Sequence, residues 1–250
     1  LPIIRTAIFL AFEFFMSLII YPYIEESGPE NMATDYSLFQ EINSTDPIFR
    51  HYGWHNEEIT FGYGQNWSWV SKQEIIKSRN ITRRPTGGGI VKHGQDWTYM
   101  LILPNGHSSF LIPSLDLYEK IHRAIGKALG QLGHETTLKP CPQKSEIKAG
   151  IPGNCFLEPV GRDLMSSNGT TKLAGAAMKR TKKGILVQGT IELSGFFNLD
   201  LEQLKTSIFS EIEKLVDEKA KVAEWPKGYI DSRACYVEQF SSSSWRENRK

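Results

Sequence analysis

Hydrophobic positions recur along the chain with two periods, one typical of helices and the other of strands. Apolar residues three or four positions apart predict three longer helices, over residues 29–42, between Pro113 and Gly133, and over residues 201–215. Short runs bounded by glycine, proline or asparagine predict strands at 48–52, 58–63, 98–103, 172–178 and 184–193. No repeat and no long linker separates these elements, so the pattern predicts a single mixed α/β domain.

The N-terminal stretch departs from this pattern, because residues 3–20 are almost all apolar. A membrane-spanning helix needs about 20 apolar residues, but Glu13 near the centre would cost roughly 2.5–3.5 kcal/mol on insertion. Three interpretations remain open: an extension upstream of a natural start at Met16, a membrane anchor, or a packed helix. We therefore treat residues 1–17 as an apolar N-terminal extension and residues 18–250 as the folded domain.

The composition is that of an ordinary globular protein. The 250 residues are 40% hydrophobic and 23% charged, with a formal net charge of +1, which excludes a collagen-like, disordered or polytopic membrane protein. Near-neutral charge also argues against nucleic-acid binding by bulk electrostatics. Cys141, Cys155 and Cys235 form no Cys-x-x-Cys pair, so neither a disulfide framework nor a zinc site is expected. We expect reduced thiols, no metal and a cytoplasmic protein, with membrane association left open by the apolar N-terminus.

The first segment that suggests chemistry is the glycine-rich stretch from Arg83 to His93. It reads Arg-Arg-Pro-Thr-Gly-Gly-Gly-Ile-Val-Lys-His, and three consecutive glycines carry an entropic cost that some function must require. Bare backbone N–H groups and the adjacent arginines could hold an anionic or carbonyl group of a ligand. The alternative is a flexible turn between two strands, but the flanking Arg84 and His93 favour ligand binding.

Two further segments carry side chains suited to catalysis. Lys172 precedes Leu-Ala-Gly175 in a predicted strand, which would place an ammonium beside closely packed backbone, where it suits a phosphate or a polarised carbonyl. Cys155 lies in a loop rich in glycine and proline, and a nearby ammonium would favour its nucleophilic thiolate form. Taken singly, a surface lysine and an inert cysteine are the more common interpretations of such residues.

Together these segments resemble the family of lipoate–protein ligase A and octanoyltransferases, whose catalytic domain is shared with biotin protein ligases. The similarity begins near Leu18 and includes, in order, motifs at 31–35, 50–54, 60–65, 83–93, 172–175 and 188–190. Each motif is weak alone, and their order makes the set specific. The biotin branch is less similar, because its Gly-Arg-Gly-Arg-type loop is missing from the sequence. The resemblance implies a mixed α/β sheet in a single biotin/lipoate ligase-like catalytic domain, related to class II aminoacyl-tRNA synthetase cores.

The resemblance also implies an activity and roles for individual residues. Members of this family attach a lipoyl or octanoyl group to one lysine of a lipoyl-domain protein, such as the E2 subunit of 2-oxoacid dehydrogenases or the glycine cleavage H protein. Lys172 matches the essential family lysine that contacts the acyl carbonyl and phosphate. The residues expected to bind the acyl chain or acyl phosphate are Arg84, Gly87, Gly88, Gly89, His93, Gly175 and Gly189.

Two chemistries occur in the family, and the residues favour the transferase. Ligases activate free lipoate with ATP and Mg²⁺, whereas transferases take octanoate from acyl carrier protein or another lipoyl-domain protein through a cysteine thioester and need no cofactor. Cys155 matches the nucleophile of one transferase branch, and segment 96–99 also resembles that branch. Gly89 is instead the ligase-type residue. The ATP-dependent ligase therefore remains an alternative, as does a non-catalytic protein that binds lipoyl domains or acyl chains.

Overall fold

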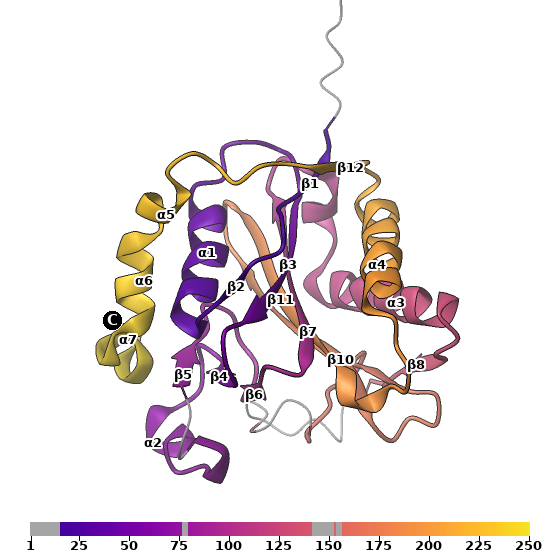
Figure 1. Ribbon diagram of the computed structural model, residues 1–250, viewed down its shortest axis with the longest axis horizontal. Helices are drawn as coiled ribbons and strands as arrows, with labels where there is room; N and C mark the ends of the chain where they lie inside the picture. The colour runs from indigo at the N-terminus through magenta and orange to yellow at the C-terminus, as the bar shows by residue number, and fades with distance from the viewer. Residues whose placement is uncertain (1–15, 77–79, 142–152, 154–156) are drawn as a thin grey trace, which may run out of the picture.

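A mixed β-sheet with helices on both faces forms the centre of the molecule (Figure 1). The structure is a computed structural model that describes residues 16–76, 80–141, 153 and 157–250. Within these residues, nine strands form the central sheet. Their order is β12 (Ala220–Val222), β1 (Leu18–Ile20), β3 (Ile48–Trp54), β7 (Asp96–Pro104), β11 (Gly184–Glu192), β10 (Lys172–Arg180), β9 (Leu164–Ser166) and β8 (Thr136–Leu138), while β2 (Glu25–Glu26) pairs with β3. The pairs β12–β1, β1–β3 and β2–β3 are parallel and the others antiparallel, which confirms the expected mixed sheet.

Helices cover the two faces of this sheet and enclose two separate apolar cores. On one face lie α3 (Ser114–Gln131) and α4 (Leu201–Val216), and on the other lie α1 (Gly28–Gln40) and α6 (Ala234–Ser241) (Figure 1). Strand β7 shows the two-sided burial clearly. Tyr99 and Leu101 belong to the core under α3 and α4, whereas Met100 and Ile102 belong to the core under α1 and α6. Alternate side chains of one strand therefore serve both cores.

A second, three-stranded sheet holds the glycine-rich stretch. Its order is β5 (Asn80–Arg83), β4 (Glu58–Phe61) and β6 (Val91–Lys92), with β4 parallel to β5 and antiparallel to β6. The glycine-rich stretch connects β5 to β6 and so passes over one end of β4. The remaining short elements are α2 (Trp67–Val70), η1 (Glu74–Ile76), η2 (Ser108–Leu111), η4 (Leu193–Gly195), α5 (Tyr229–Ser232) and α7 (Ser243–Asn248).

The predicted helices and strands are confirmed, with small changes at their ends. Helix α3 starts directly after Pro113 and stops before Gly133, whose φ of 85° is a left-handed conformation that suits glycine. Beyond the last predicted helix, the C-terminal residues form α5, α6 and α7, which bury Phe240 and Trp245. Across the described part of the chain, no helix is both long and apolar enough to cross a membrane. Most of the apolar N-terminal extension, residues 1–15, lies outside the described residues.

Candidate active site

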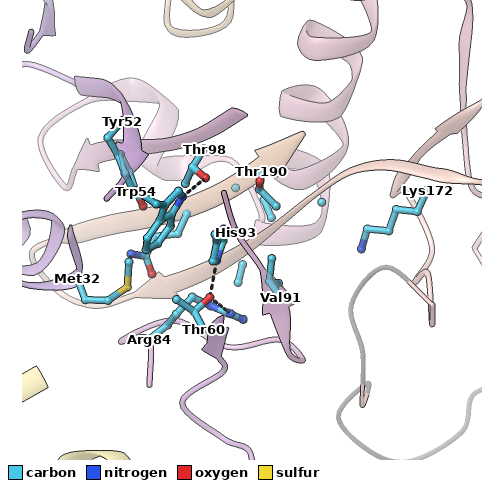
Figure 2. Close-up of a pocket in the computed structure, with 15 residues that line it drawn as sticks. Met32, Tyr52, Trp54, Thr60, Arg84, Val91, His93, Thr98, Lys172 and Thr190 are labelled. Atoms are coloured by element: carbon cyan, nitrogen blue, oxygen red, sulfur yellow. Dashed lines mark hydrogen bonds between the residues drawn. The ribbon is translucent and has the colours of Figure 1, made fainter. Parts of the chain in front are cut away.

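A pocket lies between the central sheet and the three-stranded sheet, and both sheets contribute to its walls. Its lining residues are Met32, Tyr52, Trp54, Thr60, Arg84, Val91, His93, Thr98, Lys172, Gly175, Ala176, Ala177, Gln188, Gly189 and Thr190. Figure 2 shows Lys172 at one end of this group and Met32, Tyr52 and Trp54 at the other. A pocket with a cation at one end and apolar or aromatic walls at the other suits an apolar chain with a polarised head group.

The structure brings most of the expected site residues together. Five of them line this one pocket although they come from distant parts of the sequence: Arg84, His93, Lys172, Gly175 and Gly189. Gly87, Gly88 and Gly89 do not line the pocket, although the loop that contains them runs beside it. Cys155 lies outside the described residues. Lys172 thus shares a pocket with Arg84 and His93 of the glycine-rich stretch, whereas the three glycines themselves lie outside its lining.

Arg84 fixes the shape of the glycine-rich loop. One terminal nitrogen of its buried guanidinium donates to the carbonyl oxygens of Gly87 and Gly89, at 2.8 and 2.9 Å. Gly88 has a φ of 88°, and a Cβ on Gly62 would lie only 2.0 Å from the carbonyl oxygen of Gly88. The close approach of these two backbone segments requires glycine at Gly62, and the turn favours it at Gly88.

The neighbouring Arg83 has a different role from Arg84. Its side chain is fully buried, lies 4.5 Å from the ring centre of Phe61, and donates to the backbone carbonyls of Tyr63 and Gln65 at 2.7 and 2.8 Å. Burial, with a contribution from nearby Arg249, lowers the pKa of Arg83 to about 10. The two adjacent arginines therefore both organise the protein's own backbone, and Arg84 alone lines the pocket.

A change of register in β10 determines where Lys172 points. Lys172 pairs with Met165 of β9 and Ala174 pairs with Leu164, so β10 has one extra residue between these pairs. A bulge of this kind inverts the alternation of side chains. A Cβ on Gly175 would lie 2.6 Å from both Nζ and Cε of Lys172, which shows that the lysine crosses the space that a side chain at Gly175 would fill. The Lys-Leu-Ala-Gly spacing thus has a steric cause.

His93 belongs to a chain of hydrogen bonds that begins at Arg84 (Figure 2). Arg84 donates to the hydroxyl oxygen of Thr60 at 2.8 Å, and this oxygen lies 2.7 Å from Nε2 of His93. Nδ1 of His93 lies 2.7 Å from Oδ2 of Asp96. A carboxylate only accepts, so Nδ1 carries a proton and donates to Asp96. The network therefore fixes the orientation of the His93 ring between Thr60 and Asp96.

Asp96 forms the other end of this chain of hydrogen bonds. Its Oδ2 atom also accepts the hydroxyls of Thr98 and Thr190, and Thr98 in turn accepts the indole N–H of Trp54 at 2.9 Å. Burial raises the pKa of Asp96, but the charge and hydrogen bond of His93 and the two threonine hydroxyls together hold it below its ordinary value. The indole of Trp54 stacks on His93 with ring centres 4.0 Å apart. The aromatic wall and the polar chain are thus held as one unit.

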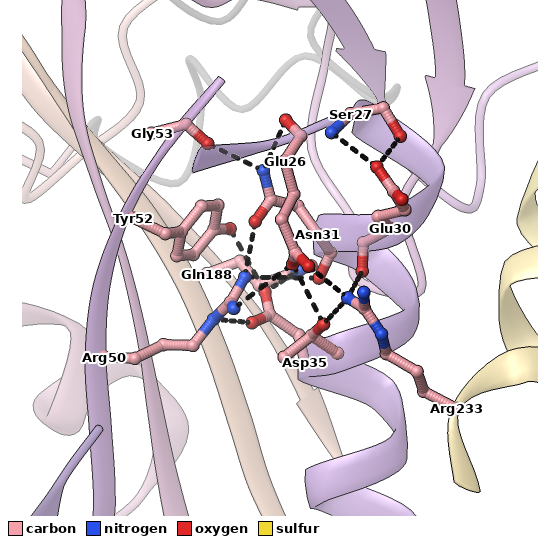
Figure 3. A network of polar contacts seen from close by, with 11 residues as sticks. Glu26, Ser27, Glu30, Asn31, Asp35, Arg50, Tyr52, Gly53, Gln188 and Arg233 are labelled. Atoms are coloured by element: carbon pink, nitrogen blue, oxygen red, sulfur yellow. Dashed lines mark hydrogen bonds and ion pairs between the residues drawn. The ribbon is translucent and has the colours of Figure 1, made fainter. Parts of the chain in front are cut away.

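A second buried network supports the pocket from the side of α1 (Figure 3). Asp35 accepts from Nε of Arg50 at 2.8 Å and from the side-chain amide of Gln188 at 2.7 Å. The amide oxygen of Gln188 then accepts the hydroxyl of Thr86, at 2.7 Å, in the glycine-rich loop. Arg233, which directly precedes α6, joins the same network through Glu26. The motifs at 31–35 and 50–54 therefore supply support behind the pocket as well as parts of its wall.

Sequence reasoning missed several residues that shape the site. Thr60, Trp54 and Thr190 lie within the matched motifs, but no feature of the sequence singled them out from their neighbours. Asp163 and Tyr118, which contact Lys172 directly or through one another, lie in segments that carried no motif at all. A network made of single residues from separate elements leaves no spacing pattern that a sequence can display.

Comparison with known proteins agrees with the motifs. Residues 27–247 match the family model of the lipoyl protein ligase A/B catalytic domain. The octanoyltransferase LipM of Staphylococcus aureus is 27% identical over 192 residues, which cover 74% of this chain and 67% of that protein. The octanoyltransferase LipM of Geobacillus kaustophilus is 29% identical over 196 residues, which cover 76% of this chain and 68% of that protein.

Solved structures of low sequence identity share the fold. The crystal structure of lipoate-protein ligase A bound with ATP superposes with a TM-score of 0.72 at 15% identity, covering 93% of this chain and 99% of that chain. The bi-partite lipoate protein ligase from Thermoplasma acidophilum, studied with its E2 lipoyl domain, superposes with a TM-score of 0.69 at 14% identity, covering 92% and 96%. The expected fold is thereby confirmed.

Proposed function

Because the chain belongs to the lipoyl protein ligase A/B catalytic domain family, we propose that it transfers an octanoyl or lipoyl group to a lysine of a lipoyl-domain protein. The observation that carries this proposal is the polarity of the pocket, with Lys172 at one end and Met32, Tyr52 and Trp54 at the other (Figure 2). An acyl chain placed along the pocket would have its carbonyl at Lys172 and its tail against the apolar walls. Relatives named octanoyltransferase LipM support transfer over ATP-dependent ligation.

The reaction needs an acyl donor with a good leaving group, since a free carboxylate does not react with an amine. In the first step, the Cys155 thiolate attacks the donor thioester, a new sulfur–carbon bond forms, and the donor leaves as a thiolate that takes up a proton. In the second step, the acceptor lysine amine attacks the Cys155 thioester, an amide forms, and Cys155 leaves as a thiolate while the amine proton passes to solvent. The Lys172 ammonium stabilises the negatively charged oxygen in both steps.

The nucleophile is the part of this mechanism that rests on sequence. Cys155 lies outside the described residues, but Gly153, two positions earlier, contacts the glycine-rich stretch. Its carbonyl oxygen accepts the N–H of Ile90 at 2.9 Å and the side-chain amide of Gln65 at 3.3 Å. This attachment beside the glycine-rich stretch supports Cys155 as the nucleophile of the same site.

A transfer assay with defined donors tests the proposal. The purified chain is mixed with an apo lipoyl domain and either octanoyl acyl carrier protein or octanoate with ATP and Mg²⁺, and the mass of the acceptor is measured. We expect a mass gain with the acyl carrier protein donor and no ATP requirement. Cys155→Ser and Lys172→Ala should each lose transfer. The control Cys235→Ser, which changes an exposed cysteine, should keep full transfer.

Each other outcome identifies a different function. A mass gain only with octanoate and ATP, retained in Cys155→Ser, would assign ligase chemistry, which Gly89 favours. No mass gain with either donor, although the acceptor binds, would assign a non-catalytic protein. The same assay with E2 and glycine cleavage H protein lipoyl domains identifies the preferred partner.

A further inference from the structure

A buried carboxylate lies behind Lys172 in a part of the chain that no motif covers. Oδ2 of Asp163 is 2.8 Å from Nζ of Lys172, and the Asp163 side chain has no exposed surface. The same oxygen accepts the N–H of Val160 at 2.7 Å, and Oδ1 accepts the hydroxyl of Tyr118 on α3. Three donors thus fix both the position and the orientation of this carboxylate.

The turn that carries Asp163 is held in an uncommon conformation. Arg162 has a φ of 71°, and a non-glycine residue in this region costs roughly 1–3 kcal/mol unless its surroundings enforce it. Here Arg162 forms ion pairs with Asp116 and Glu119 of α3, at 3.1 and 3.2 Å. The backbone carbonyl of Asp163 also accepts the N–H of Lys139 at 2.9 Å. The conformation that directs Asp163 at Lys172 is therefore imposed by contacts outside the pocket.

Two titratable side chains of α3 complete the surroundings of this ion pair. Burial, and to a smaller extent the charge of the Asp163 carboxylate, raises the pKa of Tyr118, so its hydroxyl stays protonated and donates. His122 donates through Nδ1 to the carbonyl of Tyr118 at 3.0 Å, and burial together with the Lys172 charge lowers the pKa of His122 to about 3. His122 is therefore neutral. Among the described groups in this cluster, Asp163 supplies the negative charge beside Lys172.

We infer that Asp163, oriented by Tyr118, is a positioning residue for Lys172 in acyl transfer, an inference that rests on the proposed function. Asp163 does not line the pocket, so it acts through the lysine. Its carboxylate pairs with the buried ammonium and holds it across Gly175, where the ammonium can stabilise the oxygen that becomes negative during transfer. Tyr118 links this pair to the pocket wall, because its hydroxyl oxygen also accepts the N–H of Ala176 at 3.4 Å.

Steady-state kinetics of acyl transfer provide the first test. Asp163→Asn keeps the shape of the side chain but places an amide beside the ammonium. We expect kcat to fall about 10²-fold while KM for the acyl donor changes less than about threefold, because ground-state binding relies mainly on the apolar walls. Tyr118→Phe should lower kcat by a smaller factor and tests the same idea if Asp163→Asn does not fold. The control is Glu57→Gln, which removes an exposed lysine–carboxylate pair of similar length, 2.9 Å to Lys92.

Chemical labelling of lysine provides a second test that needs no enzymatic activity. Acetic anhydride reacts with uncharged amines, and mass spectrometry measures acetylation of each lysine. Lys172 should react about tenfold faster in Asp163→Asn than in the unmodified chain at the same pH, whereas Lys92 should react at nearly the same rate in Glu57→Gln. Unchanged kcat together with unchanged Lys172 labelling in Asp163→Asn overturns the inference. If the unmodified chain transfers no acyl group, the proposed function fails and with it the role in acyl transfer, while the labelling result still decides whether Asp163 holds the Lys172 ammonium.

Discussion

The contact between Lys172 and Gly175 leads to a sharp prediction for Gly175→Ala. The added Cβ would lie 2.6 Å from Nζ and Cε of Lys172, whereas ordinary contacts begin at 3.4 Å. The lysine must therefore move by about 1 Å, and a misplacement of this size at a reacting centre can lower a rate by about 10²-fold, or about 2.7 kcal/mol in activation free energy. The clashing atoms are the end of a flexible side chain, so the free energy of unfolding should change by less than about 1 kcal/mol.

The assay compares acyl transfer and thermal unfolding in the same preparations. Gly130→Ala is the matched control, since a Cβ at Gly130 in α3 meets no atom within 4 Å. That variant should keep full activity and gain slightly in stability, because alanine is favoured over glycine inside a helix by roughly 0.5–1 kcal/mol. If Gly175→Ala transfers acyl groups as fast as the unmodified chain while its stability is unchanged, the position of the Lys172 ammonium does not control the rate.

Two further predictions concern stability. A Cβ on Gly189 would lie 2.3 Å from the ring of Tyr99, its pairing partner on β7, so Gly189→Ala should lower the free energy of unfolding by about 1–3 kcal/mol in urea titrations. Adding Tyr99→Leu to that variant should recover part of this loss. If it recovers none, the clash with the Tyr99 ring is not the cause. Burial lowers the pKa of His51 to about 4, so the unfolded chain takes up the proton first as the pH falls. The contribution of buried, neutral His51 to the free energy of unfolding is therefore complete above about pH 6.5 and decreases toward pH 4, by up to about 3 kcal/mol. The drop in urea midpoint between pH 7 and pH 5 should be smaller in His51→Gln than in the unmodified chain. An equal drop in both would show that His51 does not cause the pH dependence.

The sequence predicted those features that depend on neighbouring residues. Helix α3 could be placed because its apolar residues repeat regularly between Pro113 and Gly133. Strand β7 could be placed because its apolar run ends at Pro104, and β11 because an apolar run, residues 185–187, directly follows Gly184. The convergence of Lys172 with the glycine-rich stretch came from the family resemblance, since no local pattern relates two segments so far apart.

Features that depend on long-range contacts were not predictable. The bulge that turns Lys172 toward Gly175 is visible only in the pairing of β10 with β9. The Asp163 carboxylate meets Lys172 because of an uncommon backbone angle at Arg162, which no propensity indicates. The C-terminal helices are short and rich in polar residues, and they are stabilised by packing, of α6 against α1 and of α7 against α6 and β5, rather than by their own periodicity.

Trp245 on α7 ties the last helix to the strand that leads into the glycine-rich loop. Its indole N–H donates to the carbonyl of Arg83 at 2.9 Å, while Nε of Arg83 donates to the carbonyl of Arg246 at 2.8 Å. The two bonds run in opposite directions, so neither partner can shift along the other without breaking one of them. For protein engineering, the practical consequence is that a tag or fusion partner joined at the C-terminus should leave residues 243–248 intact, since trimming them would release β5 at the entrance to the loop.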